Sequence, residues 1–163
     1  MSQGDDLALI EPWIGALIAQ LKPGARRRLS VKIGQYVRRE NAARIAANVE
    51  PDGTAMQARK PREARRASVK SGRIRKKGKM FRKIAKQKAL KVRPQADGVE
   101  VSFANPLIEK TAAEHQFGEV GFVGKTKSGS TVRTRYPARR LLGFGRNDPD
   151  AIMDLVLAHV TGA

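Results

Sequence analysis

The chain has 163 residues, a formal net charge of +18 from thirty-three Lys and Arg against fifteen Asp and Glu, and no cysteine. Its length fits one domain, and the lack of cysteine excludes disulfide frameworks, thiolate zinc sites and cysteine nucleophiles. No apolar run approaches about 18 residues and the N-terminus is acidic, so we expect no membrane span, secretory signal or membrane partner, and the basic charge favours an anionic partner.

Two helices joined by a short loop are predicted at the N-terminal end. Asp5 or Asp6 caps the first helix, and an apolar stripe at helical spacing follows. The stripe consists of Ile10, Trp13, Ile14, Leu17, Ile18 and Leu21. Lys22-Pro23-Gly24 ends this helix, and a second helix is predicted over about residues 25–47. One face of the second helix is marked by Leu29, Ile33, Tyr36, Val37, Arg44 and Ile45. The pair is thus predicted as an αα-hairpin in which each helix buries one side.

A turn and a long basic arm are expected next. Glu50-Pro51-Asp52-Gly53 combines a proline that presets φ with a glycine that permits the following conformation. The apolar pattern then collapses, and seventeen of the thirty-three basic residues lie between Arg59 and Arg93 against one acid, Glu63. High charge with few large apolar side chains predicts a mobile or partner-ordered arm over about residues 54–78. The expected interaction residues of this basic arm are Arg62, Arg65, Arg66, Lys70, Arg73, Arg75, Lys76, Lys77 and Lys79.

Beyond the arm, the sequence predicts a small, mostly antiparallel sheet. Residues 79–89 are expected to form a short basic helix that leads into it. Residues 90–93 and 99–103 alternate apolar with polar side chains around a glycine-containing loop, which predicts a β-hairpin. Further strands of the same sheet are predicted at about residues 131–136 and 139–143.

Two more helices and a loop complete the predicted elements. A short helix is expected over residues 107–115. Three glycines between residues 118 and 124 indicate a flexible loop. The last helix begins at Asp148, which acts as the N-cap before Pro149 at the first helical position.

No residue pattern in the chain indicates catalysis, a cofactor or a metal. The segment 118–126 approaches a phosphate-binding P-loop, but five residues instead of four separate its first glycine from the Gly-Lys-Thr that ends it. His115 and His159 lack a second metal-type ligand at helical spacing. No pair of carboxylates is placed beside a base at helical spacing. We therefore predict no catalytic, cofactor-binding or metal-binding residues.

The basic stretch leaves two kinds of partner open. The first is nucleic acid, bound without sequence specificity, because Lys and Arg neutralise phosphates with little precise geometry. Phe81 is the one aromatic residue between positions 59 and 93, whereas stacking platforms for single strands or RNA need several. The other kind of partner is an acidic protein surface, against which an arm that is disordered alone becomes ordered.

Several short motifs follow one another in a recognisable order. They are Leu21-Lys22-Pro23-Gly24, Arg38-Arg39-Glu40-Asn41, Glu50-Pro51-Asp52-Gly53, Gly78-Lys79-Met80-Phe81, Glu114-His115-Gln116-Phe117-Gly118 and Tyr136-Pro137-Ala138-Arg139-Arg140-Leu141-Leu142-Gly143. In this order they resemble the phage virion morphogenesis family, the tail completion proteins of contractile-tailed phages, over most of the chain. One departure is Met56, where the resemblance leads us to expect an aromatic residue, usually Trp.

The resemblance implies a structural protein and not an enzyme. Such proteins finish the head-proximal end of the tail and allow it to join the head. Related neck and tail-end proteins form rings around the DNA channel, often with six-fold symmetry. The resemblance thus implies a homo-oligomeric ring, with a hexamer as the expected form. It also implies contacts with tail tube, sheath or terminator and head-connector proteins, and a place in the virion after assembly in the host cytoplasm. The basic arm would clasp acidic neighbours or face DNA in the channel.

The resemblance also implies shaping roles for its motif residues. By position, residues 115–118 would form a turn beside the sheet, and residues 137–142 would form the strand before the last helix. Roles in the core and in a subunit contact are favoured over ligand roles. The family-motif residues are Pro51, Asp52, Gly53, His115, Gln116, Phe117, Gly118, Pro137, Arg139, Leu142 and Gly143.

We therefore predict one α+β domain over residues 1–163. An N-terminal helical hairpin and a C-terminal helix pack on the small sheet, and the basic arm projects from it. The predicted function is tail completion through ring formation. A non-specific basic nucleic-acid-binding module, such as a ribosome-associated or packaging protein, is the alternative. An enzyme with an unrecognised site is a third and weaker hypothesis.

Overall fold

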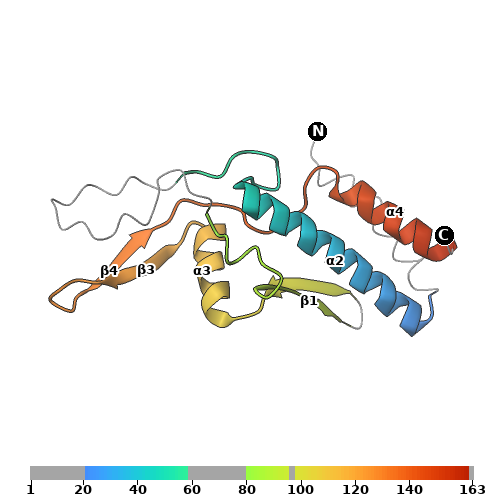
Figure 1. The fold of residues 1–163 in the computed structure, drawn as a ribbon, viewed down its shortest axis with the longest axis horizontal. Coiled ribbons are helices and arrows are strands. Elements are labelled where there is room, and N and C mark those ends of the chain that lie inside the picture. The colour runs from blue at the N-terminus through green and yellow to red at the C-terminus, as the bar shows by residue number, and fades with distance from the viewer. Residues whose placement is uncertain (1–20, 59–79, 96–97, 162–163) are drawn as a thin grey trace.

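The computed structural model describes residues 21–58, 80–95 and 98–161, and Figure 1 shows their arrangement. The helices and strands are α2 (Pro23–Ala47), β1 (Leu90–Pro94), β2 (Val99–Phe103), α3 (Pro106–Gln116), β3 (Val120–Lys125), β4 (Thr131–Arg135) and α4 (Asp148–Thr161). This set of elements confirms the α+β class. The predicted first helix, up to Gln20, and residues 59–79 of the basic arm lie outside the described residues.

Helix α2 is the central element, with the β1–β2 hairpin along one side and α4 along another (Figure 1). It begins at Pro23, whose fixed φ and missing N–H suit the first helical position. It ends where Asn48 adopts the left-handed conformation (φ 59°) and donates its N–H to the carbonyl of Ile45 at 3.2 Å. These bounds agree closely with the predicted range of 25–47.

The β1–β2 hairpin packs directly on the backbone of α2. Its strands are antiparallel, with Val92 opposite Val101, as the alternation predicts. Gly34 is buried at the contact, and a Cβ at this position would collide with methyl groups of Val92 and Val99. A residue without a side chain therefore sets how closely the hairpin approaches the helix.

The hydrophobic core lies where α2, α3 and the β1–β2 hairpin meet the loops on either side of the undescribed arm. Its buried members are Ile45, Met56, Met80, Ile84, Leu90, Phe103, Ala112 and Leu141. Met56, which stands where the resemblance predicts an aromatic residue, is 5% exposed and belongs to this cluster. A flexible thioether side chain fills irregular space well, so the 54–58 segment packs without the aromatic ring.

The predicted sheet is divided in two. Strands β1 and β2 form one two-stranded antiparallel sheet, and β3 and β4 form another. Residues 139–143, predicted as a strand, lie outside any strand, and the N–H groups of Leu141, Leu142 and Gly143 bond to side chains of α2 and α3 instead. The glycine-rich segment 118–124, predicted as a flexible loop, contributes most of β3.

Residues 80–89 form turns and not the predicted basic helix. Phe81 has a φ of 56°, which a helix does not permit. Isolated bonds follow it, such as that from the N–H of Ile84 to the carbonyl of Phe81 at 2.9 Å. Met80 and Ile84 are buried while the Lys and Arg between them and β1 are exposed, so burial of two side chains outweighs helix formation here.

Helices α3 and α4 agree with the prediction. The Oδ1 of Asn105 accepts from the N–H of Leu107 at 2.8 Å and caps α3, with Pro106 at the first helical position. Helix α4 begins at Asp148 as expected. In the part of the chain that the structure describes, no helix is both long enough and apolar enough to cross a membrane.

Candidate assembly surface

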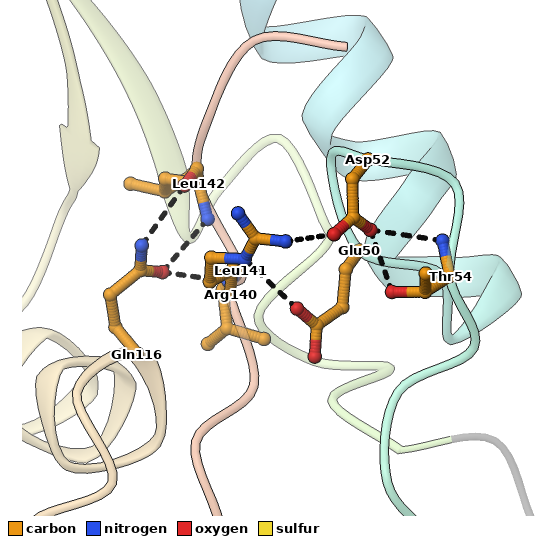
Figure 2. A network of polar contacts seen from close by, with 7 residues as sticks. All are labelled: Glu50, Asp52, Thr54, Gln116, Arg140, Leu141 and Leu142. Carbon is orange, nitrogen blue, oxygen red and sulfur yellow. Dashed lines mark hydrogen bonds and ion pairs between the residues drawn. The ribbon is translucent and has the colours of Figure 1, made fainter. Parts of the chain in front are cut away.

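The linking segment, residues 137–147 between β4 and α4, is held by side chains. The Oε1 of Gln116 accepts from the N–H groups of Leu141 at 2.7 Å and Leu142 at 3.0 Å (Figure 2). Its Nε2 donates to the carbonyl of Leu142 at 3.0 Å. One amide at the end of α3 thus supplies bonds of the kind that a neighbouring strand supplies, and the contact holds Leu141 in the core.

Two polar side chains of α2 hold the next part of the linking segment. The buried Asn41 accepts from the N–H of Gly143 at 3.0 Å through Oδ1, while its Nδ2 donates to the carbonyl of Val37 at 2.8 Å. Arg44 donates to the carbonyl of Gly143 at 2.9 Å. Both backbone groups of Gly143 are therefore bonded to α2, which satisfies them away from water.

The carboxylate of Asp148 joins the linking segment to α2 and α4. Asp148 is 3% exposed, and it accepts from Arg44 at 3.0 Å, from the N–H of Gly145 at 2.7 Å and from the hydroxyl of Tyr36 at 3.1 Å. Burial, followed by the hydrogen bond to Asp148, raises the pKa of Tyr36. Three donors compensate the cost of burying this carboxylate, so the start of α4 is fixed against α2.

Arg139 connects the linking segment to α3 and to the loop after α2. It is 3% exposed, and its guanidinium donates to the carbonyls of Gln57 at 2.6 Å and Ala58 at 3.2 Å and to Nδ1 of His115 at 3.1 Å. A guanidinium can only donate, so Nδ1 of His115 accepts and the ring proton lies on Nε2. The imidazole also packs edge-on against Phe81, with 4.8 Å between the ring centroids. These contacts give His115 a structural position.

Arg140, the next residue, clamps the Pro-Asp-Gly turn. Its guanidinium pairs with Glu50 at 3.0 Å and with Asp52, as Figure 2 shows. Asp52 also accepts from the N–H of Thr54 at 3.0 Å and from its hydroxyl at 2.6 Å. The bonds from Thr54, and then the charge of Arg140, hold the pKa of Asp52 below its usual value. The bond to Glu50, and then the charge of Asp52, raise the pKa of Arg140.

The predicted family-motif residues meet in space although they lie far apart in the sequence. The turn at 51–53, the end of α3 at 115–118 and residues 137–143 all adjoin the linking segment or belong to it. Pro51 is buried beside Gly143, where a Cβ would come within 2.7 Å of the proline ring. Phe117 is 71% exposed and contributes to the surface instead. The nine predicted arm residues, from Arg62 to Lys79, lie outside the described residues.

The β3–β4 ribbon, residues 119–136, exposes a group of large apolar side chains. These are Val120, Phe122, Val123 and Val132, each between 39% and 56% exposed. Within the described residues, each strand of the ribbon pairs only with the other. A two-stranded hairpin is marginally stable in water, and open strand edges invite further pairing. The ribbon therefore presents a surface that a partner would stabilise.

One face of the ribbon combines apolar and basic side chains. Val120 lies opposite Arg135, and Phe122 lies opposite Arg133. Side chains of directly opposed residues project from the same face of an antiparallel pair, and all four of these residues are exposed. This face can bury apolar area while its arginines meet acidic groups.

The outer face of α4 is acidic and partly apolar, so its charge is complementary to that of the ribbon. Asp150, Asp154 and Leu157 follow a spacing of four and three residues, so they share one side of the helix, and all three are exposed. Figure 1 shows α4 and the β3–β4 ribbon at opposite ends of the described structure. One molecule thus carries a basic apolar surface at one end and an acidic apolar surface at the other.

Sequence reasoning missed β3 and with it the ribbon. Val120 and Phe122 alternate with Gly121, which is the period of a strand, but the glycines favoured a loop. The signal that reveals the hairpin is this alternation placed before the tip at 126–130 and the predicted strand after it. Among the described residues, no three His, Asp or Glu side chains are grouped so as to hold a metal ion.

Comparison with known proteins gives two consistent results. The chain matches the phage virion morphogenesis family over residues 5–161. It is also 33% identical over 150 residues to the tail completion protein S of Escherichia phage P2, an alignment that covers 92% of this chain and 94% of that protein. No solved structure gives a significant match.

Proposed function

The chain belongs to the phage virion morphogenesis family, and on this basis we propose that it completes the head-proximal end of the phage tail and supports head–tail joining as a homo-oligomeric ring. The resemblance carried by its motifs is confirmed by both comparisons. The observation that carries the proposal is the likeness to a tail completion protein over 92% of the chain. The role is structural: the protein contacts other components of the virion tail. We further propose that it is assembled there in the host cytoplasm and acts by binding and not by catalysis.

In the proposed ring, the β3–β4 ribbon of one copy docks on α4 of the next. The ribbon contributes the exposed Phe122 beside Arg133, and α4 contributes Leu157 with Asp150 and Asp154 on the same side. The contact would bury apolar area at its centre and pair opposite charges at its rim. Because the two surfaces lie at opposite ends of the described structure, the contact is head-to-tail, and repetition closes a ring when the rotation fits.

The basic arm would contact anionic partners next to the ring. Between positions 59 and 79, eleven Lys and Arg stand against the single acid Glu63. So many like charges repel one another unless an anionic partner opposes them. Acidic surfaces of the tail tube, sheath or terminator and head-connector proteins would do this, and so would DNA in the channel.

The proposal is tested by the particles that form in the absence of the protein. In a phage that lacks it, electron microscopy should show heads and tails that accumulate unjoined, and supplying the chain from a plasmid should restore infectious particles. Phe122→Ser should fail to restore them. Leu107→Ser, at a position that is 76% exposed on α3, is the matched control and should succeed. Normal infectious particles without the protein would contradict the proposal.

A non-specific nucleic-acid-binding module is the second candidate, favoured by the net charge of +18. It predicts that the isolated protein binds duplex DNA tightly, with an affinity that falls steeply as salt rises. It also predicts that Phe122→Ser leaves this binding, and the phage, unchanged. Tail completion predicts instead that particle formation is lost with the ribbon whatever the affinity for DNA.

A further inference from the structure

The solvent side of α2 carries a row of polar positions that we call the basic stripe. Its members are Arg28, Lys32, Gln35 and Arg39. They follow spacings of four, three and four residues, which places them on one face of the helix, and all four are exposed. Helix α2 packs against the β1–β2 hairpin and α4 through its other sides. The basic stripe therefore stays open to a partner within the described residues.

The charges of the basic stripe are not neutralised by the described residues. Seven Lys and Arg lie between positions 22 and 39 of the sequence, with no acid among them. Arg28 and Lys32 make no ion pair with a described residue, and they stand four residues apart, where like charges destabilise a helix. Arg39 lies 3.6 Å from Glu40, yet its side chain remains 70% exposed. An anionic partner would therefore relieve a repulsion along α2.

The surroundings of the basic stripe favour duplex nucleic acid over a protein or a single strand. Protein interfaces bury an apolar centre, but none of the large apolar side chains exposed in the described residues lies on α2. Single strands are bound by stacking on aromatic rings. The one aromatic residue of α2, Tyr36, is half-buried, bonded to Asp148 and covered by the guanidinium of Arg39 at 5.8 Å. A charged face without these groups suits a phosphate backbone, which is bound through charge density.

We propose that the basic stripe of α2 binds the phosphate backbone of duplex DNA. At about 1.5 Å per residue, the distance along the helix from Arg28 to Arg39 is about 16 Å. One strand of a duplex carries a phosphate about every 3.4 Å along the axis, so the stripe runs beside about five phosphates. The contact reads no sequence, because phosphates carry none. The proposal goes beyond the tail role and does not depend on it, and it assigns a DNA contact to α2 in addition to the basic arm.

The first experiment measures how the affinity for DNA depends on salt. The full chain is titrated into a fluorescein-labelled duplex at several salt concentrations, and fluorescence anisotropy gives the affinity at each. Arg28→Gln with Lys32→Gln should lower the slope of log affinity against log salt by about 1.8, because each lost phosphate contact removes about 0.9. Lys125→Gln with Lys127→Gln is the matched control. It removes the same charge from exposed side chains near the tip of the ribbon, away from α2 (Figure 1), and should leave the slope unchanged.

Two results of the salt titrations would overturn the proposal. A slope that falls equally in both variants would show that net charge alone governs the binding. An unchanged slope in Arg28→Gln with Lys32→Gln would place the DNA contact elsewhere in the chain. Circular dichroism establishes that each variant keeps the fold, and if the α2 variant does not fold, the second experiment decides.

The second experiment attaches a photocrosslinker to the basic stripe without changing its charge. The sequence has no cysteine, so Gln35→Cys supplies a single thiol for azidophenacyl bromide. On irradiation with the duplex, it should crosslink to DNA at least about tenfold more than Ser128→Cys, an exposed position at the ribbon tip, because binding raises the effective concentration of DNA at α2. Similar yields at the two positions would overturn the proposal. Crosslinks from Gln35→Cys to another copy of the chain in place of DNA would also overturn it, because they would assign the stripe to a protein contact.

Discussion

The side-chain amide of Gln116 makes the hydrogen bonds to the backbone of Leu141 and Leu142 that a neighbouring strand would otherwise make. Gln116→Ala would leave two N–H groups and one carbonyl of a partly buried segment without their partner. We expect it to lower the free energy of unfolding by about 2–3 kcal/mol in urea titrations followed by circular dichroism. Gln95→Ala, at an exposed position, is the control and should change it by less than about 0.5 kcal/mol. Similar losses in the two variants would contradict the role assigned to Gln116.

Tyr36 makes the stability of the fold sensitive to alkali. Its pKa is raised above 10.0, first by burial and then by the hydrogen bond to Asp148. The folded chain therefore holds the phenolic proton more tightly than the unfolded chain does. This contribution is fully present below about pH 10 and is lost as the pH rises through the raised pKa.

Tyr36→Phe isolates this contribution from the titration of the many lysines. The difference in free energy of unfolding between the unaltered chain and Tyr36→Phe should shrink as the pH rises from about 9 to about 11. Urea titrations at several pH values in this range measure it. A difference that stays constant with pH would show that the phenol is not held as the structure indicates.

At the scale of the elements, two glycines of α2 test how the β1–β2 hairpin packs. A Cβ at Gly34 would collide with Val92 and Val99, whereas the nearest atom to a Cβ at Gly24 is Nη1 of Arg28 at 3.7 Å. Gly34→Ala should therefore lower the free energy of unfolding by about 1–3 kcal/mol, because the hairpin must move away from the helix. Gly24→Ala should stabilise by about 0.5–1 kcal/mol, because alanine favours a helix. Urea titrations in which both variants change the free energy of unfolding in the same direction would refute the close contact at Gly34.

The linking segment explains why the elements on either side of it depend on one another. It joins β4 to α4, and its polar bonds reach α2 through Asn41 and Arg44 and α3 through Gln116. A loosened linking segment would therefore displace both the ribbon and α4, the two surfaces proposed for the ring. We therefore propose that the family-motif residues act mainly by holding these surfaces in place.

At the scale of the whole molecule, the ring contact can be tested by exchange of charge. Arg133→Glu with Arg135→Glu should weaken self-association about tenfold or more. Each arginine at the rim contributes a fraction of a kcal/mol of attraction, and each glutamate in its place adds repulsion of similar size. Asp150→Lys with Asp154→Lys should weaken it similarly. Combining all four changes should restore association, as should mixing the two double variants. Light scattering coupled to size-exclusion chromatography measures each case.

Lys86→Glu with Lys88→Glu is the control for this experiment. It changes the net charge by the same amount as the ribbon variant and alters exposed side chains in the 80–89 loop. It should leave association unchanged. If the control weakens association as much as the ribbon variant, or if the four changes together fail to restore it, the proposed contact between ribbon and α4 is wrong.

The sequence by itself determined the elements whose signals act within a few residues. The helices predicted over about residues 25–47 and 107–115 match α2 and α3 closely, Asp148 marks the start of α4, and strict alternation marks β1 and β2. The order of motifs also identified the family, and the charge of the basic arm is a property of the sequence alone. The roles of that arm and of the ring stay predictions.

Only the tertiary structure decided what residues 137–147 do and where the ribbon lies. Residues 139–143 have the pattern of a strand, but the partners of Leu142 and Gly143 are Gln116 and Asn41, 26 and 102 residues away along the chain. No spacing rule connects such distant groups, because hydrogen bonding depends on where packing brings them. Phe81 and the glycines of β3 were mispredicted for the same reason: burial of Met80 and pairing with β4 outweighed their local preferences.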